Sequence, residues 1–253
     1  MAHALMTRVI GNKLFLAPID PSKLHRILDI GTGTGIFFCT DFVAKVVGND
    51  LSAFQPTWVP PNVKFEIDDV ESPWVGQKYD YIMCRYMAAS IGDWPKLVKN
   101  VYDHLNPGGW AEFQDMSVEY YSDDDSYKPE HATWDWNMTF VKTLKSIGRD
   151  PCPGPQLEGW VRGNGGFERI THRKFKVPIG PWPKHQPYKD LGLLNLAQIL
   201  EGLEGFTLKL FCGILGKSKE EVQVQLARVR NELKGNAFHS LFDIHVVYGQ
   251  KPL

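Results

Sequence analysis

The sequence of 253 residues predicts a doubly wound α/β fold, a mostly parallel sheet with helices on both faces. Three observations predict it. Segments of strand and helix character alternate over the first half of the chain, a glycine-rich turn follows the first buried strand, and acidic residues stand at the ends of three successive strands. Hydrophobic residues make up 43% and charged residues 23%, so we expect an ordinary globular protein with a large core.

The predicted first strand, residues 26–30, is apolar except for Asp29 and runs directly into a glycine-rich turn. Glycine has no Cβ, so alternate glycines let backbone N–H groups come close to a ligand. The alternative is a glycine-rich turn that binds nothing. The turn comprises Gly31, Thr32, Gly33, Thr34 and Gly35.

The glycine spacing distinguishes between ligands. A dinucleotide site has the pattern G-x-G-x-x-G/A, which from Gly31 would place a small residue where Ile36 stands. The observed pattern, D-x-G-x-G-x-G, disfavours a nicotinamide oxidoreductase. It resembles motif I of class I S-adenosylmethionine (SAM)-dependent methyltransferases, in which the acid meets the methionine end of the cofactor.

A second acid supports a nucleoside ligand. The predicted strand 45–50 ends at Asp50, nineteen residues after Gly31. An acid about 20 residues beyond such glycines can accept hydrogen bonds from both hydroxyls of a ribose. The alternative is a helix cap, a role that Ser52 could also fill.

The third and fourth predicted strands complete the rim of a ligand crevice. Strand 62–67 is followed by Asp68 and Asp69, and strand 79–84 by Arg85. Ligands on doubly wound sheets bind outside the carboxyl ends of the strands, where these side chains are expected.

The remaining elements follow from periodicity and turn residues. Only about fourteen residues separate the first two strands, so the helix after the glycines is expected to be short. The apolar segment Leu14–Ile19 is expected to pack against the sheet edge or to cover the cofactor, and the acidic run 122–126 to be a solvated loop. Further predicted elements are helices 93–104, 130–147, 157–162, 188–204 and 218–234, a turn at 106–109, and strands 110–121, 167–177 and 242–250.

These elements predict one domain over residues 1–253, with a helical insertion at 178–234 as a candidate lid. Net charge is −1 without a long basic run, which argues against direct nucleic-acid binding. No apolar run reaches membrane-spanning length, and the N-terminus lacks the order of a signal peptide. The four cysteines are scattered without C-x-x-C, which indicates reduced thiols, no metal site and an intracellular protein of cytoplasm or nucleus.

Several longer phrases make the resemblance narrower. They are "ILDIGTGTGIF", "GNDLSAFQPTWVPPNVKFEIDDVESPW", "SIGDWPKLVKNVYDHLNPGGWAEFQD", "VPIGPWPK", "LLNLAQILEGLEG" and "FHSLFDIHVVYGQKP". Together they resemble the fungal LaeA-like methyltransferases, a group that includes global regulators of secondary metabolism, from about Gly11 to Pro252. The resemblance implies a Rossmann-like seven-stranded sheet with the last strand antiparallel, and SAM as cofactor, released as S-adenosylhomocysteine.

The resemblance also implies the cofactor contacts. Asp29 through Gly35 would meet the methionine end and the loop. Arg85 matches a family arginine near that end and could pair with the cofactor carboxylate, with a surface salt bridge as the alternative. The ribose would be held by Asp50 with Leu51 and Ser52 beside it, and the adenine by Asp69 and Val70 with Asp68 as neighbour.

Methyl transfer needs alignment and exclusion of water, and a general base only if the acceptor must lose a proton. The candidate bases are His239, Tyr86, His104 and His131. His239 is preferred because it precedes the last strand within a family-like phrase, with a structural hydrogen-bonding role as the alternative.

Two departures from the family pattern bear on activity. The glycine-loop helix is shortened between Phe42 and Lys45, and family members usually carry a longer N-terminal segment that folds over the cofactor. We therefore expect weaker cofactor binding than in a chain extended at its N-terminus. The sequence predicts a SAM-dependent methyltransferase of secondary metabolism that acts on a small-molecule or protein acceptor. The alternative is a catalytically weak regulatory scaffold that binds protein partners.

Overall fold

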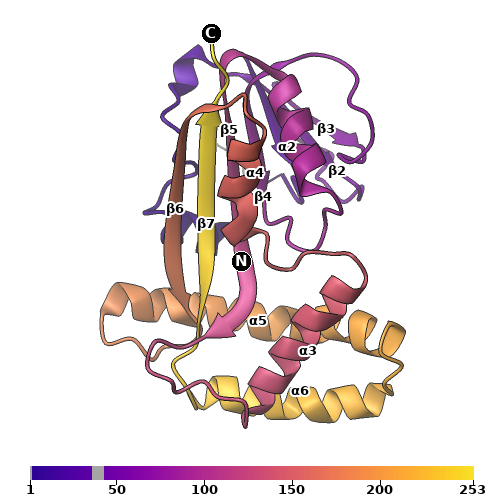
Figure 1. Cartoon of the computed structure of the whole chain (residues 1–253), viewed down its shortest axis with the longest axis vertical. Helices are drawn as coiled ribbons and strands as arrows, with labels where there is room; N and C mark the ends of the chain where they lie inside the picture. The colour runs from indigo at the N-terminus through magenta and orange to yellow at the C-terminus, as the bar shows by residue number, and fades with distance from the viewer. Residues whose placement is uncertain (1, 36–42) are drawn as a thin grey trace. The chain divides into compact units, whose positions relative to one another are not determined.

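A computed structural model describes residues 2–35 and 43–253 and contains one seven-stranded sheet (Figure 1). The strand order is β3-β2-β1-β4-β5-β7-β6, and the last strand, β7, is antiparallel, which confirms the predicted fold class. The strands are β1 (Arg26–Ile30), β2 (Lys45–Asp50), β3 (Val63–Ile67), β4 (Tyr79–Arg85), β5 (Leu105–Tyr121), β6 (Glu168–Pro178) and β7 (Leu241–Gln250). The α-helices are α1 (Ala2–Val9), α2 (Trp94–Asp103), α3 (Ala132–Ser146), α4 (Leu157–Gly163), α5 (Gln186–Gly213) and α6 (Lys219–Lys234), with short 3-10 turns at Pro21–Lys23 and Gly154–Gln156.

The chain divides into two compact units. Unit 1 comprises Met1–Asn12, Met116–Cys152 and Phe175–Ile244, and unit 2 comprises Lys13–Asp115, Pro153–Lys174 and His245–Leu253. The stretch 178–234 lies within unit 1. Its role as a lid stays a prediction.

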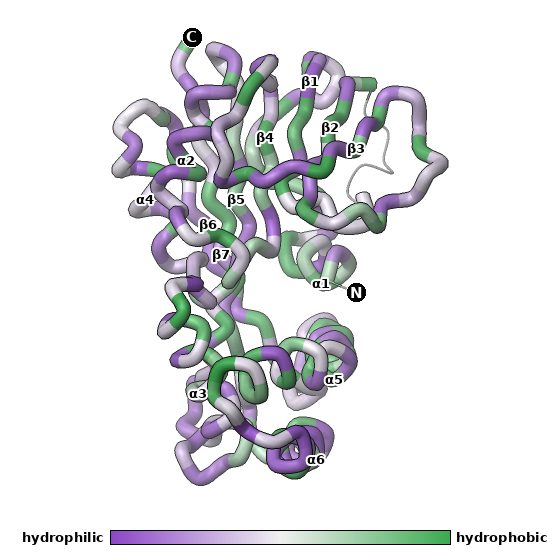
Figure 2. The backbone as a smooth tube through the Cα atoms, turned by 90° about the vertical axis from the view of Figure 1, so that its right-hand side faces the viewer, coloured by the Kyte–Doolittle hydropathy of each residue, from purple (hydrophilic) through white to green (hydrophobic). Residues whose placement is uncertain are grey.

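Unit 2 holds the parallel strands that carry the predicted site. β1 pairs in parallel with β2 and with β4, and this register sets Asp29 opposite both Gly48 and Met83. β1 and β4 contain short apolar runs (green in Figure 2) whose residues are buried in succession, as expected of central strands that are covered on both faces. The carboxyl ends of the strands therefore meet at one rim, as the sequence predicts.

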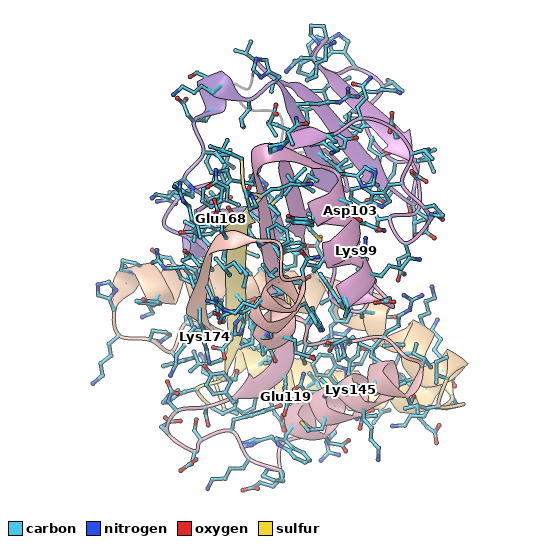
Figure 3. The ribbon with its side chains drawn as sticks, turned by 45° about the horizontal axis from the view of Figure 1, so that its top comes forward. Lys99, Asp103, Glu119, Lys145, Glu168 and Lys174 are labelled. Atoms are coloured by element: carbon cyan, nitrogen blue, oxygen red, sulfur yellow. The ribbon has the colours of Figure 1, made fainter. Side chains whose placement is uncertain are left out.

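One face of this sheet packs against α2 and α4. Asp93 caps α2 by accepting a hydrogen bond from the Lys96 N–H at 2.9 Å. The opposite, exposed face of the helix carries the ion pair between Lys99 and Asp103, which are one turn apart (Figure 3). The residues that α2 buries, at helical spacing, are Trp94, Leu97, Val98 and Val101.

The other face of the sheet is covered by the segment that precedes β1. Leu14, Phe15 and Ile19 pack against a cluster that includes Ile27 and Tyr81. The expectation that this segment packs at the sheet edge is wrong, because the cluster also contains residues of β2, β4 and β5, so the segment crosses a face. Whether it covers the cofactor stays a prediction.

Unit 1 is built around α5, whose 28 residues make it longer than the predicted helix 188–204. The predicted boundary was wrong because two glycines, Gly202 and Gly205, lie inside the helix and do not end it. Helix α1, which periodicity did not reveal, contacts α5 within this unit. The buried residues Leu191, Asn195, Ile199, Leu203, Thr207 and Phe211 recur every four positions along α5.

The acidic loop of unit 1 is not merely solvated. Asp123 pairs with Lys176 at 2.7 Å, and Asp124 lies 2.5 Å from Nδ1 of His239. The predicted turn at 106–109 falls inside β5, where Gly108 has a φ of 77°. The predicted helix after Gly35 lies outside the described residues, as do Ile36 and Cys39. Within the described ranges, no helix is both long and apolar enough to cross a membrane.

Candidate cofactor site

The glycine-rich turn after β1 needs glycine for two separate reasons. Gly31, Gly33 and Gly35 all adopt left-handed backbone conformations, with φ of 69°, 57° and 74°. A Cβ at Gly31 would lie 2.3 Å from Sδ of Met87, and one at Gly35 would lie 2.2 Å from the ring of Phe65. At Gly33 a Cβ would meet nothing within 4 Å. Gly31 and Gly35 thus make room for protein, whereas the open side of Gly33 can face a ligand.

Asp50 is joined directly to this turn. Its Oδ2 accepts the Gly33 N–H at 2.9 Å, and its Oδ1 accepts the Ser52 N–H at 3.0 Å. The cap alternative is wrong, because no helix begins in the described residues 51–62. Each carboxylate oxygen keeps further lone pairs, so the side chain can still accept hydrogen bonds from a ribose.

Asp29 near the end of β1 and Arg85 at the end of β4 influence each other electrostatically. Asp29 is only 4% exposed, and burial raises its pKa to about 7 against the opposing influence of Thr32 and Arg85. Burial lowers the pKa of Arg85, and Asp29 is the strongest of the charges that oppose this. Pairing of Arg85 with the cofactor carboxylate, and the alternative of a surface salt bridge, both stay predictions.

The residues predicted for the adenine end follow β3. The Oδ1 of Asp69 accepts the Glu71 N–H at 2.9 Å, and both Asp68 and Asp69 are exposed. Val70 packs its side chain into the core and its carbonyl accepts from Nε1 of Trp74 at 2.9 Å. The side chain of Val70 is therefore not available to a ligand, so this residue could contact an adenine only through its main chain. Leu51 is 71% exposed.

The loop after β4 is held in an unusual conformation. Tyr86 and Ala89 have left-handed φ angles of 57° and 61°, which cost free energy in residues other than glycine. Asp115, buried at the end of the unit 2 part of β5, accepts the Met87 N–H at 2.7 Å. Sequence reasoning missed Asp115 because this residue lies inside the predicted strand 110–121 and not at its end, where acids were sought elsewhere.

Glu112 and Gln114 were also missed. Both are fully buried on β5, and they hold the segment 14–17 by its backbone. Glu112 accepts the N–H groups of Leu16 and Ala17 at 2.9 and 2.6 Å, and Gln114 donates to the Leu14 carbonyl at 3.2 Å. We call residues 14–17 the strap.

The residues present fit a polar cofactor. Among the described residues, three buried acceptor or donor atoms near the rim have no hydrogen-bond partner: Oγ1 of Thr32, Oδ1 of Asn49 and Oε1 of Gln114. The hydroxyl of Thr32 lies close enough to Asp29 to lower the pKa of that carboxyl, but the two groups do not meet the geometric criteria of a hydrogen bond. Buried polar groups are normally satisfied, so such atoms indicate a missing ligand or solvent contact.

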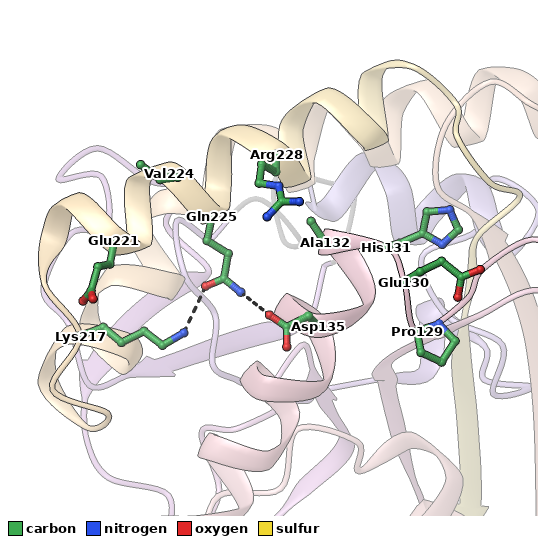
Figure 4. A pocket seen from close by; sticks show the side chains of 10 residues that line it. All are labelled: Pro129, Glu130, His131, Ala132, Asp135, Lys217, Glu221, Val224, Gln225 and Arg228. Atoms are coloured by element: carbon green, nitrogen blue, oxygen red, sulfur yellow. Dashed lines mark hydrogen bonds between the residues drawn. The ribbon is translucent and has the colours of Figure 1, made fainter.

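Two of the candidate bases have clear structural roles. Nδ1 of His104 lies 2.9 Å from the Asn100 carbonyl at the end of α2. His131 precedes α3, with Nδ1 3.1 Å from the backbone of Lys128, and lines a cleft of about 430 Å³ in unit 1 (Figure 4). Asp135 and Gln225 are hydrogen-bonded across this cleft at 2.9 Å.

His239 has the geometry of an oriented base. Asp124 lies 2.5 Å from its Nδ1, and the imidazole stacks on Trp182 with ring centroids 4.9 Å apart. The pKa of Asp124 is lowered to about 2, chiefly by its hydrogen bond with Ser126 and then by that with His239. A carboxylate on Nδ1 leaves Nε2 as the proton acceptor, as in other Asp–His pairs. His239 belongs to unit 1, whereas the predicted cofactor residues belong to unit 2.

The fold matches those of solved methyltransferases. Haemonchus contortus phosphoethanolamine N-methyltransferase 2, solved with S-adenosylhomocysteine, aligns with a TM-score of 0.58 and 18% identity over 99% of this chain and 52% of that enzyme. The [4+2]-cyclase SpnF aligns with a TM-score of 0.52 and 16% identity, over 90% of this chain and 75% of that protein. These likenesses concern the fold alone.

Sheet order, glycine turn and strand-end acids define a class I SAM-dependent methyltransferase. Residues 1–165 match the family described as the methyltransferase domain, and the chain belongs to that family. Methyltransferase pytC of Aspergillus terreus is 44% identical over 258 residues, which cover 100% of this chain and 79% of pytC.

Two further relatives come from other fungi. Probable methyltransferase tdiE of Emericella nidulans is 30% identical over 100% of this chain and 80% of its own length. Secondary metabolism regulator LAE1 of Cochliobolus heterostrophus is 31% identical over 99% of this chain and 85% of its own length. The chain is therefore a fungal LaeA-like methyltransferase that uses SAM as its methyl donor.

Proposed function

We propose that this methyltransferase acts on a small molecule made by fungal secondary metabolism. The support is the relationship to methyltransferase pytC, whose 44% identity with this chain exceeds the 31% shared with the regulator LAE1. A regulatory scaffold with a protein partner remains the second candidate, favoured only by the regulator relatives. We also propose an intracellular location, as composition and cysteine usage predict.

One observation carries the proposed cofactor site: the hydrogen bond of 2.9 Å from the Gly33 N–H to Asp50. It joins the glycine turn to the acid of the next strand, which supports the proposal that the two sequence signals belong to one site. Asp50 would hold the ribose, with Ser52 and the exposed Leu51 beside it. The open face of Gly33 would let the cofactor approach the turn.

The two ends of the cofactor would be held on either side of Asp50. Asp29 and Arg85 would meet the amino and carboxylate groups of the methionine end. Asp68, Asp69 and the Val70 main chain would meet the adenine. When bound, SAM supplies a methyl group already activated on a sulfonium, so the protein has chiefly to align it and exclude water.

We further propose His239 as the base for an acceptor that must lose a proton. Asp124 would fix its tautomer and support the positive charge that develops on proton uptake. This proposal rests on the geometry within unit 1 alone.

Calorimetry with SAM and with NADH tests the cofactor site. SAM should bind and NADH should not, because the glycine spacing is not that of a dinucleotide site. Release of S-adenosylhomocysteine in the presence of a fungal metabolite extract then separates the enzyme from the scaffold. Binding of SAM without any turnover, together with capture of a defined protein partner, would favour the scaffold.

A further inference from the structure

The amide of Gln114 has one orientation in this structure. Its Nε2 donates to Oε1 of Glu112 at 2.7 Å and to the Leu14 carbonyl at 3.2 Å. Both partners are acceptors at this edge, so the NH₂ group must face them and Oε1 must face away. That oxygen is buried and meets no donor anywhere in residues 2–35 and 43–253.

A buried acceptor without a hydrogen bond lowers the stability of a protein, so the unpaired oxygen of Gln114 calls for an explanation. Leaving such a group unpaired costs roughly 1–3 kcal/mol, and native proteins keep few of them. Gln114 stands opposite Arg85 in the parallel register of β4 and β5. Arg85 in turn interacts with Asp29. The oxygen is therefore at the rim of the cofactor site.

The strand order tells which donor of the cofactor can reach it. The proposed adenine and ribose contacts follow β3 and β2, while Asp29 and Arg85 end β1 and β4. Because adjacent strands lie about 4.8 Å apart, β5 is next to the methionine end and several strands from the adenine. The donor available at that end of SAM is its α-ammonium group.

We propose that Gln114 is a cofactor-binding residue, whose Oε1 accepts a hydrogen bond from the α-ammonium of SAM, and that Glu112 is the residue that positions it. This inference rests on the proposed cofactor site. Gln114 thereby favours binding of ligands that carry the amino-acid end over ligands that lack it.

Glu112 positions Gln114 because it fixes both the amide and the strap. Its carboxylate accepts from Gln114, Leu16 and Ala17, and the hydroxyl of Tyr81 approaches it at 3.3 Å. The strap has no regular secondary structure, so these hydrogen bonds hold its backbone, while Leu14, Phe15 and Ala17 pack in the apolar cluster on this face of the sheet. Since Oε1 of Gln114 is enclosed, cofactor entry must shift a neighbouring group, and the strap is the element that can move without breaking a helix or strand.

The test compares two ligands. SAM has the α-ammonium, whereas methylthioadenosine keeps the adenosine and the methyl-bearing sulfur, as an uncharged thioether, and lacks the amino-acid end. In Gln114→Leu, SAM should bind about 10- to 100-fold more weakly, the effect of losing one hydrogen bond to a charged group. Affinity for methylthioadenosine should stay within about twofold. Glu112→Gln should also weaken SAM binding relative to methylthioadenosine binding, by a smaller factor than Gln114→Leu.

Gln250 provides a matched control. Its Nε2 donates to the Gly108 carbonyl at 2.9 Å, and its Oε1 is also buried without a partner among the described residues. It lies beside the amino-terminal part of β5, away from the rim. Gln250→Leu should leave both affinities unchanged.

The outcomes separate the two proposals. A parental protein that binds neither ligand refutes the cofactor site itself. A parental protein that binds both, with Gln114→Leu weakening both equally or neither, overturns the role of Gln114 alone. If Gln114→Leu does not fold, Gln114→Met replaces it. Hydrogen exchange at residues 14–17 of the parental protein must then also change on addition of SAM but not of methylthioadenosine, and an unchanged pattern counts against the inference.

Discussion

We expect cofactor binding to depend on pH because of the buried carboxyl of Asp29. Burial raises its pKa from 3.8 to about 7, so the side chain is largely protonated at pH 6 and ionised at pH 8. A cationic methionine end favours the ionised form. If only that form binds, the apparent dissociation constant scales inversely with the ionised fraction, which rises about tenfold between pH 6 and pH 8. SAM should therefore bind about tenfold more tightly at pH 8.

The same shift has the opposite sign for stability. A carboxyl whose pKa is raised on folding contributes stability that is present below its unfolded pKa and lost as pH rises towards about 7. Because one pKa unit corresponds to about 1.4 kcal/mol, ionised Asp29 costs up to about 4 kcal/mol at pH 8. Asp29→Asn should consequently be more stable than the parental protein at pH 8 and yet bind SAM more weakly.

Asp80 supplies the control for this experiment. Burial opposes the shift, but hydrogen bonds from Asn106 and from the N–H groups of His25 and Arg26 lower its pKa. Asp80→Asn should thus lose stability near neutral pH and keep its affinity for SAM. Calorimetry at pH 6, 7 and 8 and chemical denaturation measure both quantities. Equal SAM affinity across this range in the parental protein, or unchanged affinity in Asp29→Asn, would refute the reasoning.

Three further predictions concern individual residues. Asp50→Ala should lose roughly 2–4 kcal/mol of SAM binding free energy, the value of two charge-assisted hydrogen bonds, and should still unfold cooperatively. An unchanged dissociation constant would mean that Asp50 only stabilises the glycine turn. In chemical denaturation, Gly31→Ala should lower the stability of the protein more than Gly33→Ala, because only the methyl added at position 31 meets Met87, at 2.3 Å. Gly33→Ala should mainly weaken SAM binding. The reverse order of these effects would contradict the two roles of glycine. If His239 is the base, His239→Gln should lower turnover by about 10²–10⁴-fold with SAM affinity unchanged, and Asp124→Asn should lower it less; full turnover in His239→Gln excludes the role.

The sequence determined the class of fold and the edge of the sheet at which the candidate cofactor site lies. Glycine spacing after a buried strand and acids at three strand ends are local signals, and each can be read within a few residues. Parallel strands bring their carboxyl ends to one edge, so Asp29, Asp50 and Asp69 could be placed together before any tertiary contact was known. Most strand boundaries were also local, because apolar runs and turn residues mark them. The start of β5 is the exception, because the turn residues 106–109 lie inside the strand.

Only the tertiary structure decided which groups complete the site. Gln114 and Glu112 stand almost a hundred residues from the strap that they hold, and no local pattern links positions so far apart. The contact of Asp115 with the Met87 N–H and the left-handed backbone of Tyr86 are likewise consequences of packing. The charge state of Asp29 is of the same kind, since a pKa near 7 arises from burial, and burial is a property of the folded chain.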